Sequence, residues 1–251
     1  MLEIEGVSKR FGGIVAVRDV TLRLGSRPVT GLIGPNGAGK TTLFNLIAGT
    51  FRPTEGRIRL AGEDITRLPA HARFDRGLVR TFQIPHEFGK LTVLENLMVV
   101  PAGQPGERLF DTWFRPARTR AREAEIRDRA RETLAFLKLD RLAGDRAETL
   151  SGGQKKLLEL GRAMMAAPKL VLLDEPGAGV NPTLLAELAS MIETLADRGY
   201  RFCIIEHNMD MIARLCDPVV VMAEGAVLTE GSIAAVRADP RVVEAYLGSA
   251  A

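Results

Sequence analysis

The chain has few residues of the kinds that mark secreted, disulfide-stapled or membrane-embedded proteins. Only two of its 251 residues are cysteine, Cys203 and Cys216, and both lie among apolar neighbours. They form no metal-binding or redox spacing, so we interpret them as small core residues of a protein in a reducing compartment. The longest apolar runs, such as 218–223, fall far short of the roughly 20 residues that a membrane-spanning helix needs. Residues 1–5 contain neither a basic nor an apolar region, so we expect no export signal.

An excess of charge of one sign is also missing. The 34 Lys and Arg residues are nearly balanced by 31 Asp and Glu residues, and the net charge is +3. A charge this small does not predict nucleic-acid binding, and the arginines are interleaved with acids as on a solvated surface. The hydrophobic content of 46% and the charged content of 26% are ordinary for a globular protein. The length suits one large domain, or a core with a subdomain.

A glycine-rich stretch follows a short apolar strand over residues 30–33 and opens a helix. It fits the phosphate-loop pattern G-x-x-x-x-G-K-[ST]. Its residues are Gly34, Pro35, Asn36, Gly37, Ala38, Gly39, Lys40, Thr41 and Thr42.

Glycine reaches the dihedral angles that turn consecutive backbone N–H groups around an anion, and the helix N-terminus attracts the same phosphates. We expect Lys40 to reach the β and γ phosphates of a nucleotide and the Thr41 hydroxyl to ligate Mg²⁺. The alternative is a chance match in a glycine-rich turn, which the flanking strand and helix disfavour.

Two sets of strands are expected around this loop. Residues 2–7 and 14–24 alternate apolar and polar side chains, and 57–60 follows a turn. These three segments indicate an antiparallel β layer with one solvent-exposed face. Residues 170–173 and 202–205 are apolar throughout, as in strands buried on both faces of a parallel sheet.

A third wholly apolar segment, 219–222, resembles these two, and an amphipathic helix around residues 184–195 lies between the first two. The order strand, helix, strand predicts a layered α/β fold. We expect a single domain over residues 1–251, with residues 1–90 and 151–251 forming its core and antiparallel layer.

Residues 91–150 differ in kind, because they are rich in Arg, Glu and Ala and show helical periodicity. One apolar stripe is formed by Ile126, Ala130, Leu134 and Leu137. We interpret this stretch as an inserted helical subdomain whose arginines form a solvated face. The loop around the only tryptophan, Trp113, either packs on this subdomain or contacts a partner.

Two carboxylates, Asp174 and Glu175, end the apolar strand 170–173. Beside a phosphate loop, the first can hold Mg²⁺ through water, and the second can orient or deprotonate an attacking water. An acidic strand end with no chemical role is the alternative, and the neighbouring phosphate loop favours catalysis.

Residues 150–154 read Leu-Ser-Gly-Gly-Gln and open another helix. Ser151 and Gln154 form a capping-box pattern, which by itself explains a helix start. Gly152 and Gly153 are not needed for a cap and cost about 1 kcal/mol each relative to alanine. Bare backbone at a helix N-terminus indicates that an anion approaches closely.

Taken together and in this order, the three motifs resemble the nucleotide-binding subunits of ATP-binding cassette (ABC) transporters. The resemblance covers essentially all 251 residues, and the Leu-Ser-Gly-Gly-Gln pentad is specific to that family among phosphate-loop ATPases. It implies a RecA-like P-loop core with an antiparallel β layer and an inserted α-helical subdomain. It also implies ATP and Mg²⁺ as the ligands.

Three further positions match motifs of this family. Gln83 matches the glutamine that contacts Mg²⁺ and the attacking water and links the core to the helical subdomain. His207 matches the histidine that contacts the γ-phosphate, and Phe11 matches the aromatic residue that stacks on adenine. Without the resemblance, these three residues would be a strand-end glutamine, a helix-capping histidine and a phenylalanine that is equally suited to the core.

The resemblance also implies a mechanism that needs two subunits. They pair head to tail, so that Ser151, Gly152, Gly153 and Gln154 of one subunit close over ATP held on Lys40 of the other. ATP binding drives closure, and hydrolysis reopens it. The chain departs from the family at residues 177–182, where Gly-Ala-Gly-Val-Asn-Pro replaces a segment that usually carries aspartate. Communication across the dimer at that position is therefore in doubt.

Three segments narrow the resemblance to the importers of branched-chain amino acids: residues 178–182, 204–210 and 239–248. Membership of this branch implies that the chain pairs with a second copy of itself or with a paralogous ATPase. The pair would bind integral membrane permease subunits, to which a solute-binding protein delivers the solute. It implies a cytoplasmic location, peripheral on the inner face of the plasma membrane. The expected permease contact surface surrounds residues 83–97, with apolar contacts from Phe82, Ile84, Phe88 and Leu91.

Three alternatives stay open at this point. Importers of urea or short amides share these features, and a lipopolysaccharide or lipid export ATPase shares the Ala-Gly-Val segment and the His-Asn pair. A soluble cassette ATPase acting on ribosomes or DNA is the third, although such proteins usually carry tandem cassettes or long coiled-coil insertions.

Overall fold

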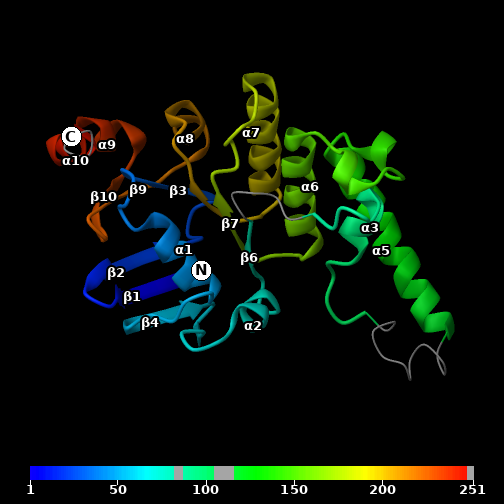
Figure 1. Cartoon of the computed structure of the whole chain (residues 1–251), viewed down its shortest axis with the longest axis horizontal. Coiled ribbons are helices and arrows are strands. Elements are labelled where there is room, and N and C mark those ends of the chain that lie inside the picture. The colour runs from blue at the N-terminus through cyan, green and yellow to red at the C-terminus, as the bar shows by residue number, and fades with distance from the viewer. Residues whose placement is uncertain (82–86, 105–115, 248–251) are drawn as a thin grey trace. The chain divides into compact units, whose positions relative to one another are not determined.

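The computed structural model of the chain describes residues 1–81, 87–104 and 116–247 (Figure 1). The chain divides into two compact units. The first contains residues 1–83, 168–178 and 182–251, and the second contains residues 84–167 and 179–181.

An antiparallel sheet forms one layer of the first unit, as the alternating segments predict. Its strands are β1 (Leu2–Phe11), β2 (Ile14–Leu24), β4 (Glu55–Leu60) and β5 (Glu63–Asp64), in the order β2-β1-β4-β5. The apolar side chains Leu2, Ile4 and Val7 are buried, while Glu3 and Glu5 on the same strand are not. Hydrophobic alternation therefore fixes which face of this sheet meets the core.

The larger sheet of this unit carries the wholly apolar segments. Its strands are β3 (Val29–Ile33), β6 (Leu78–Arg80), β7 (Leu170–Asp174), β8 (Phe202–Ile205), β9 (Val219–Ala223) and β10 (Ala226–Gly231). The order is β10-β9-β3-β8-β7-β6, with β10 antiparallel on β9 and the other neighbours parallel. The predicted α/β fold with an antiparallel layer is confirmed.

Helix α1 (Lys40–Ala48) is packed into the core between strands of both sheets. Its Leu43, Phe44, Leu46 and Ile47 belong to one buried cluster that also contains Ile4 and Leu22 of the antiparallel sheet and Leu172 and Val220 of the parallel sheet. The other helices that the structure describes in this unit are α2 (Ala70–Phe74), α7 (Pro182–Asp197), α8 (Met209–Leu215), α9 (Ile233–Ala238) and α10 (Pro240–Leu247). Helix α1 is thus held on two sides, which fixes the start of the helix beside the glycine-rich loop.

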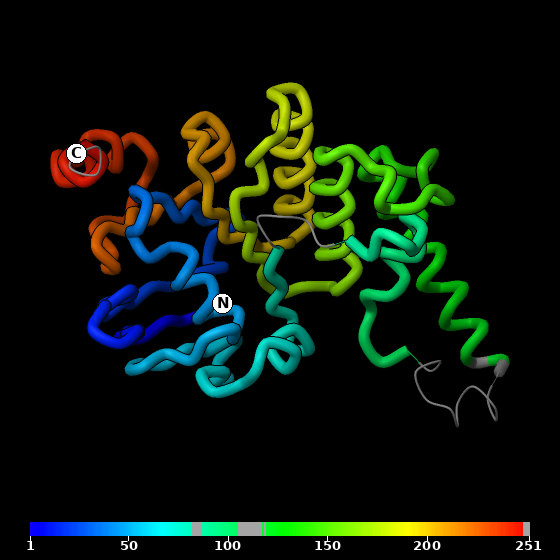
Figure 2. The backbone as a smooth tube through the Cα atoms, in the orientation of Figure 1, coloured from blue at the N-terminus to red at the C-terminus, as the bar shows by residue number. Residues whose placement is uncertain are grey.

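The second unit is helical. It contains α3 (Val93–Met98), α5 (Pro116–Phe136), two 3₁₀ turns (Asp140–Leu142 and Ala147–Thr149) and α6 (Gly152–Met165). The predicted apolar stripe is buried, with Ile126, Ala130 and Leu134 on α5 and Leu137 directly after the helix. Helices α3, α5 and α6 pack on one another (Figure 2). The unit is longer than the subdomain expected over 91–150, because α6 packs on α3 and α5. In the described ranges, we find no helix with both the length and the apolar character to cross a bilayer.

A buried arginine holds the C-terminal end of α1. Arg73 is 1% exposed, and its guanidinium donates to the carbonyls of Leu46 and Ile47 of α1, both at 2.6 Å. It also donates to the carbonyls of Thr66 and Leu68, both at 2.9 Å. Burial lowers the pKa of Arg73 to about 10, so the group stays charged at neutral pH and complements the negative end of the helix dipole.

Replacing Arg73 should therefore destabilise the fold. In Arg73→Met, four carbonyls lose a charged donor, which we expect to cost roughly 3 kcal/mol. A chain of this size should then lose about 6 to 12 °C in Tm, measured by circular dichroism. The matched control is Arg76→Met, since Arg76 forms a more exposed ion pair with Glu63 at 2.7 Å. Equal melting of the two variants would contradict this interpretation of Arg73.

Candidate active site

The polar residues of the site lie where parallel strands of the first unit end. The glycine-rich loop follows β3, Asp174 and Glu175 stand at the end of β7, and Glu206 and His207 follow β8. Because β3, β7 and β8 are parallel, their carboxyl ends share one edge of the sheet. This edge is where open α/β sheets bind ligands.

Two glycines of the loop are required by the backbone. Gly34 has φ +149°, and an added Cβ would collide with the carbonyl oxygen of Met222. Gly39 has φ +94°, and an added Cβ would lie 2.5 Å from the carbonyl oxygen of Ala16. Neither position accepts a side chain, since both the dihedral angle and the space exclude one.

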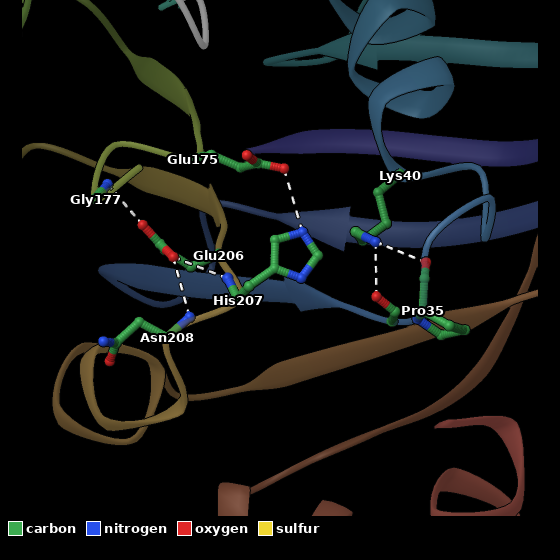
Figure 3. A network of polar contacts seen from close by, with 8 residues as sticks. Pro35, Lys40, Glu175, Gly177, Glu206, His207 and Asn208 are labelled. Carbon is green, nitrogen blue, oxygen red and sulfur yellow. Dashed lines mark hydrogen bonds and ion pairs between the residues drawn. The ribbon is translucent and has the colours of Figure 1, made fainter. Parts of the chain in front are cut away.

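Lys40 is the first residue of α1 and is 6% exposed. Its Nζ donates to the carbonyls of Gly34 at 2.6 Å and Pro35 at 2.9 Å (Figure 3). Burial lowers the pKa of Lys40, and the nearby carboxylates of Glu175 and Asp174 oppose that shift. The ammonium group therefore lies in the field of both strand-end carboxylates while it is held by its own loop.

Glu175 and His207 form a pair across the ends of β7 and β8. Nε2 of His207 lies 3.2 Å from Oε1 of Glu175, and the two side chains are 46% and 22% exposed (Figure 3). Helix α8 is capped by Asn208, whose Oδ1 accepts from the amide of Met211 at 2.9 Å, so His207 does not cap it. The ring is thus available to the neighbouring carboxylate.

The backbone of Glu175 is in the left-handed region, with φ +49°. A residue with a Cβ is rarely found there, and such strain collects at functional sites. The amide of Glu175 still takes part in the sheet, because it donates to the carbonyl of Ile205 at 2.9 Å. The chain turns only after this hydrogen bond. The strained residue therefore stands at the point where the chain leaves β7.

A buried carboxylate fixes the two loops that carry this pair. Glu206 is 5% exposed, and its Oε1 accepts from the amide of Gly177 at 2.6 Å. Its Oε2 accepts from the amides of His207 at 2.8 Å and Asn208 at 3.1 Å (Figure 3). One carboxylate therefore ties the segment after Glu175 to the segment that holds His207.

Thr41 and Asp174 supply oxygen donors at this edge. Asp174 is 4% exposed, and Thr41 stands in the first turn of α1. We find no cluster of three or more His, Cys, Asp or Glu side chains suited to a metal within the described ranges. Mg²⁺ that binds with a nucleotide needs no such cage, because phosphate and water complete its ligands. The donor set fits this ion.

Phe11 ends β1 and is 43% exposed. Its ring packs edge to face on Phe51 at a centroid distance of 5.3 Å, and Nζ of Lys9 lies 5.0 Å from its centroid. Phe11 is therefore not a core residue. Its stacking on a nucleotide base stays a prediction.

The C-terminal helix α10 reaches the phosphate loop. The backbone of Gly34 is hydrogen-bonded to Tyr246, and burial raises the pKa of this phenol. A cavity of about 740 Å³ lies beside the contact, lined by residues 35–38 of the loop and by Arg18, Arg241 and Glu244. Lys40, Asp174 and Glu175 do not line it, so this hollow is separate from the side where the reacting groups gather.

The Leu-Ser-Gly-Gly-Gln pentad lies in the second unit, at the start of α6. Its capping box is complete, because Ser151 Oγ accepts from the Gln154 amide at 3.3 Å and Gln154 Oε1 accepts from the Ser151 amide at 2.9 Å. An added Cβ at Gly152 would meet no atom within 4 Å. Nothing in the described part of this chain therefore requires a glycine at that position.

Several predicted residues lie outside the described part of the chain. These are Phe82, Gln83, Ile84 and Trp113. The roles expected for Gln83 at the metal and at the water stay predictions.

Sequence reasoning did not identify Glu206 as a site residue. The signal was available, because Glu206 follows a wholly apolar strand in the same way that Asp174 and Glu175 do. Arg80, which donates to Asp174, was missed as well. Its strand, β6, is only three residues long and shows no periodicity of its own.

Comparison with known proteins agrees with this geometry. Residues 17–178 match the family described as ABC transporter, and residues 226–251 match the family described as branched-chain amino acid ATP-binding cassette transporter. The chain is 43% identical to a probable branched-chain amino acid transport ATP-binding protein LivG of Archaeoglobus fulgidus, over 99% of this chain and 96% of that protein. It is 39% identical to the high-affinity branched-chain amino acid transport ATP-binding protein BraF of Pseudomonas aeruginosa, over 100% and 98%.

Solved structures give the same result. A nucleotide-free ATP-binding cassette from an ABC transporter has a TM-score of 0.84 at 38% identity and covers 98% of each chain. A cassette in its ADP conformation has a TM-score of 0.82 at 37% identity, over 99% of this chain and 98% of that one. Since the family match spans most of the sequence and the relatives align over almost their whole length, the chain belongs to the ATPases of the ABC transporter family, in the branched-chain amino acid group.

Proposed function

We propose that this chain is the ATP-hydrolysing subunit of an importer that takes up branched-chain or other hydrophobic amino acids. The observation that carries the proposal is the gathering of Lys40, the strand-end carboxylates and His207 at one edge of a sheet. The chain is also similar over its full length to proteins named for branched-chain amino acid transport.

The loop binds the triphosphate, and Lys40 changes partners as it does so. With a phosphate present, Nζ exchanges the carbonyls of Gly34 and Pro35 for phosphate oxygens, which are stronger acceptors for a cation. Phe11 offers its partly exposed ring to the base and is held edge to face against Phe51.

Glu175 is the residue suited to take a proton from the attacking water. It lies at the strand end, is partly exposed, and has its carboxylate oriented by His207. Glu206 keeps the two loops at a constant separation, so the base and its partner do not have to be ordered in each cycle.

Thr41 and Asp174, with Gln83, are the residues that would hold Mg²⁺. When bound, this ion would neutralise charge on the phosphates of ATP. The chain contributes the hydroxyl and the carboxylate from two separate elements, α1 and β7.

The pentad is suited to contact a nucleotide held by a second ATPase subunit, either another copy or a paralogue. Ser151 and Gly152 are exposed at the N-terminus of the 14-residue helix α6, where backbone amides and the helix dipole attract phosphate. Open space at the position where a Cβ of Gly152 would lie supports an approach from outside this chain.

A surface on the second unit is suited to a membrane permease. Phe88 is 51% exposed, and the guanidinium of Arg162 lies 5.0 Å from its ring centroid. The buried Asn96 holds the backbone on both sides, because it accepts from the amide of Phe88 at 2.9 Å and donates to its carbonyl at 3.1 Å. An exposed aromatic side chain on a backbone fixed by hydrogen bonds, such as Phe88, is suited to contact a partner protein.

These partners define the expected location. The chain would lie in the cytoplasm on the inner face of the plasma membrane, attached to permease subunits. A solute-binding protein would deliver the solute to those subunits. The chain itself does not touch the solute.

Removing the base should separate binding from turnover. Glu175→Gln keeps the size and the pairing distance but removes the proton acceptor, so we expect ATP hydrolysis to fall by about 100-fold or more with ATP affinity unchanged. Phosphate release and equilibrium titration with a fluorescent nucleotide measure the two quantities. Persistent hydrolysis in this variant would show that another group is the base.

Glu206 should matter for the rate and not for nucleotide affinity. In Glu206→Gln an amide nitrogen replaces one oxygen, so at least one backbone amide faces a donor and the two loops lose their common anchor. We expect kcat to fall by about 10-fold or more, with the Kd for ATP unchanged. The exposed Glu230→Gln is the control. If both variants turn over equally, Glu206 has no part in positioning His207 and Glu175.

Reconstituted transport tests the function as a whole. The chain would be co-expressed with its permease subunits, purified as a complex and placed in proteoliposomes with the solute-binding protein. We expect ATP-dependent uptake of labelled leucine that Glu175→Gln abolishes and that excess urea does not inhibit. Competition by urea would favour an amide importer, and full activity without any membrane partner would count against a transport motor.

A further inference from the structure

Arg80 ends the edge strand β6, and its register places it near the end of β7. Arg80 pairs with Leu172 in the parallel ladder between the two strands. Side chains two residues apart in a strand share a face, so Asp174 lies on the same face of β7 as Leu172. Helix α1 covers that face, since its apolar residues share one buried cluster with Leu172. The guanidinium of Arg80 therefore lies between the carboxylate of Asp174 and helix α1.

The guanidinium of Arg80 uses both of its terminal nitrogens there. Nη2 donates to Oδ2 of Asp174 at 2.8 Å, and Nη1 donates to Oδ1 of Asn45 on α1 at 2.6 Å. The Arg80 and Asp174 side chains are 10% and 5% exposed. Because solvent screens the attraction between two buried charges only weakly, the ion pair with Arg80 restricts the rotation of the Asp174 carboxylate.

The connection continues from Asn45 to the start of α1. Nδ2 of Asn45 donates to the carbonyl of Thr41 at 2.9 Å, one helical turn earlier. Arg80 is therefore joined to Asp174 directly and to the backbone of Thr41 through one amide. These are the two described residues to which the proposed function assigns Mg²⁺.

We propose that Arg80 is a positioning residue for the metal site, holding the carboxylate of Asp174 and the helix turn of Thr41 in a fixed arrangement relative to one another. The inference rests on the proposed function, because it takes Asp174 and Thr41 as the metal-binding pair. Arg80 would not ligate the metal itself, because a guanidinium has donors and no acceptor. Its cationic charge also balances the buried Asp174 carboxylate before a metal arrives.

The planar fork of arginine is what the geometry requires. The two acceptors lie on different elements, β7 and α1, and a guanidinium presents two donors to them at a fixed separation. An ammonium group is a point charge on a flexible stem and does not hold two acceptors at a set spacing. Lysine at this position should keep the charge balance and lose the alignment.

Metal binding, measured without turnover, tests this proposal. The full chain with Glu175→Gln is saturated with ATP and titrated with Mn²⁺, and free Mn²⁺ is followed by electron paramagnetic resonance. We expect Arg80→Met to weaken Mn²⁺ binding by about 10-fold, as for other residues that orient a metal ligand. Arg80→Lys and Asn45→Ala should weaken it by smaller factors. The affinity for ATP in EDTA should not change in any of these variants.

Two control variants make the outcome decisive. Arg76→Met removes a nearby arginine that contacts the more exposed Glu63 and the carbonyl of Ala72, and it should bind Mn²⁺ as the parent does. Asp174→Asn should lose Mn²⁺ binding. If Asp174→Asn weakens binding and the Arg80 and Asn45 variants do not, the positioning role is wrong and the metal site stands.

If Asp174→Asn itself has no effect, the assignment of the metal to this pair is wrong. Tighter Mn²⁺ binding in Arg80→Met would also overturn the inference, since Arg80 would then act as a competing cation. Should Arg80→Met fail to fold, Arg80→Lys and Asn45→Ala decide the question.

Discussion

The site depends on the parallel alignment of strands that are buried on both faces. Only because β3, β7 and β8 run the same way do a phosphate loop, two carboxylates and a histidine reach one edge of the sheet. That edge holds opposite charges at short range, with Lys40 and Arg80 facing Asp174 and Glu175. Each carboxylate in this group has a partner that limits how far it can move.

Much of the fold could be predicted because its signals are local. Apolar runs such as 170–173 and 202–205 are strands at the expected positions, and the alternation over 2–7 and 14–24 gives the antiparallel layer. The phosphate loop is recognisable from its glycines, two of which the structure requires for steric reasons. The cap of α6 follows in the same way from Ser151 and Gln154.

The residues that sequence reasoning missed act across the sheet. Glu206, at the end of β8, accepts a hydrogen bond from the segment after β7. Arg80, at the end of β6, donates hydrogen bonds to Asp174 of β7 and to Asn45 of α1. Their partners are 29, 94 and 35 positions away along the chain, so no local pattern connects them. The order β8-β7-β6 decides these contacts, and strand order is a property of the assembled sheet. Arg73 was missed for the same reason, since its acceptors on α1 become neighbours only after folding.

The two hydrogen bonds of Lys40 have a consequence for ligand selection. Its ammonium group donates to the carbonyls of Gly34 and Pro35, so one side chain ties the start of the loop to the start of α1. A ligand that recruits this ammonium group must compete with two backbone carbonyls, which favours ligands rich in anionic oxygen over weaker acceptors.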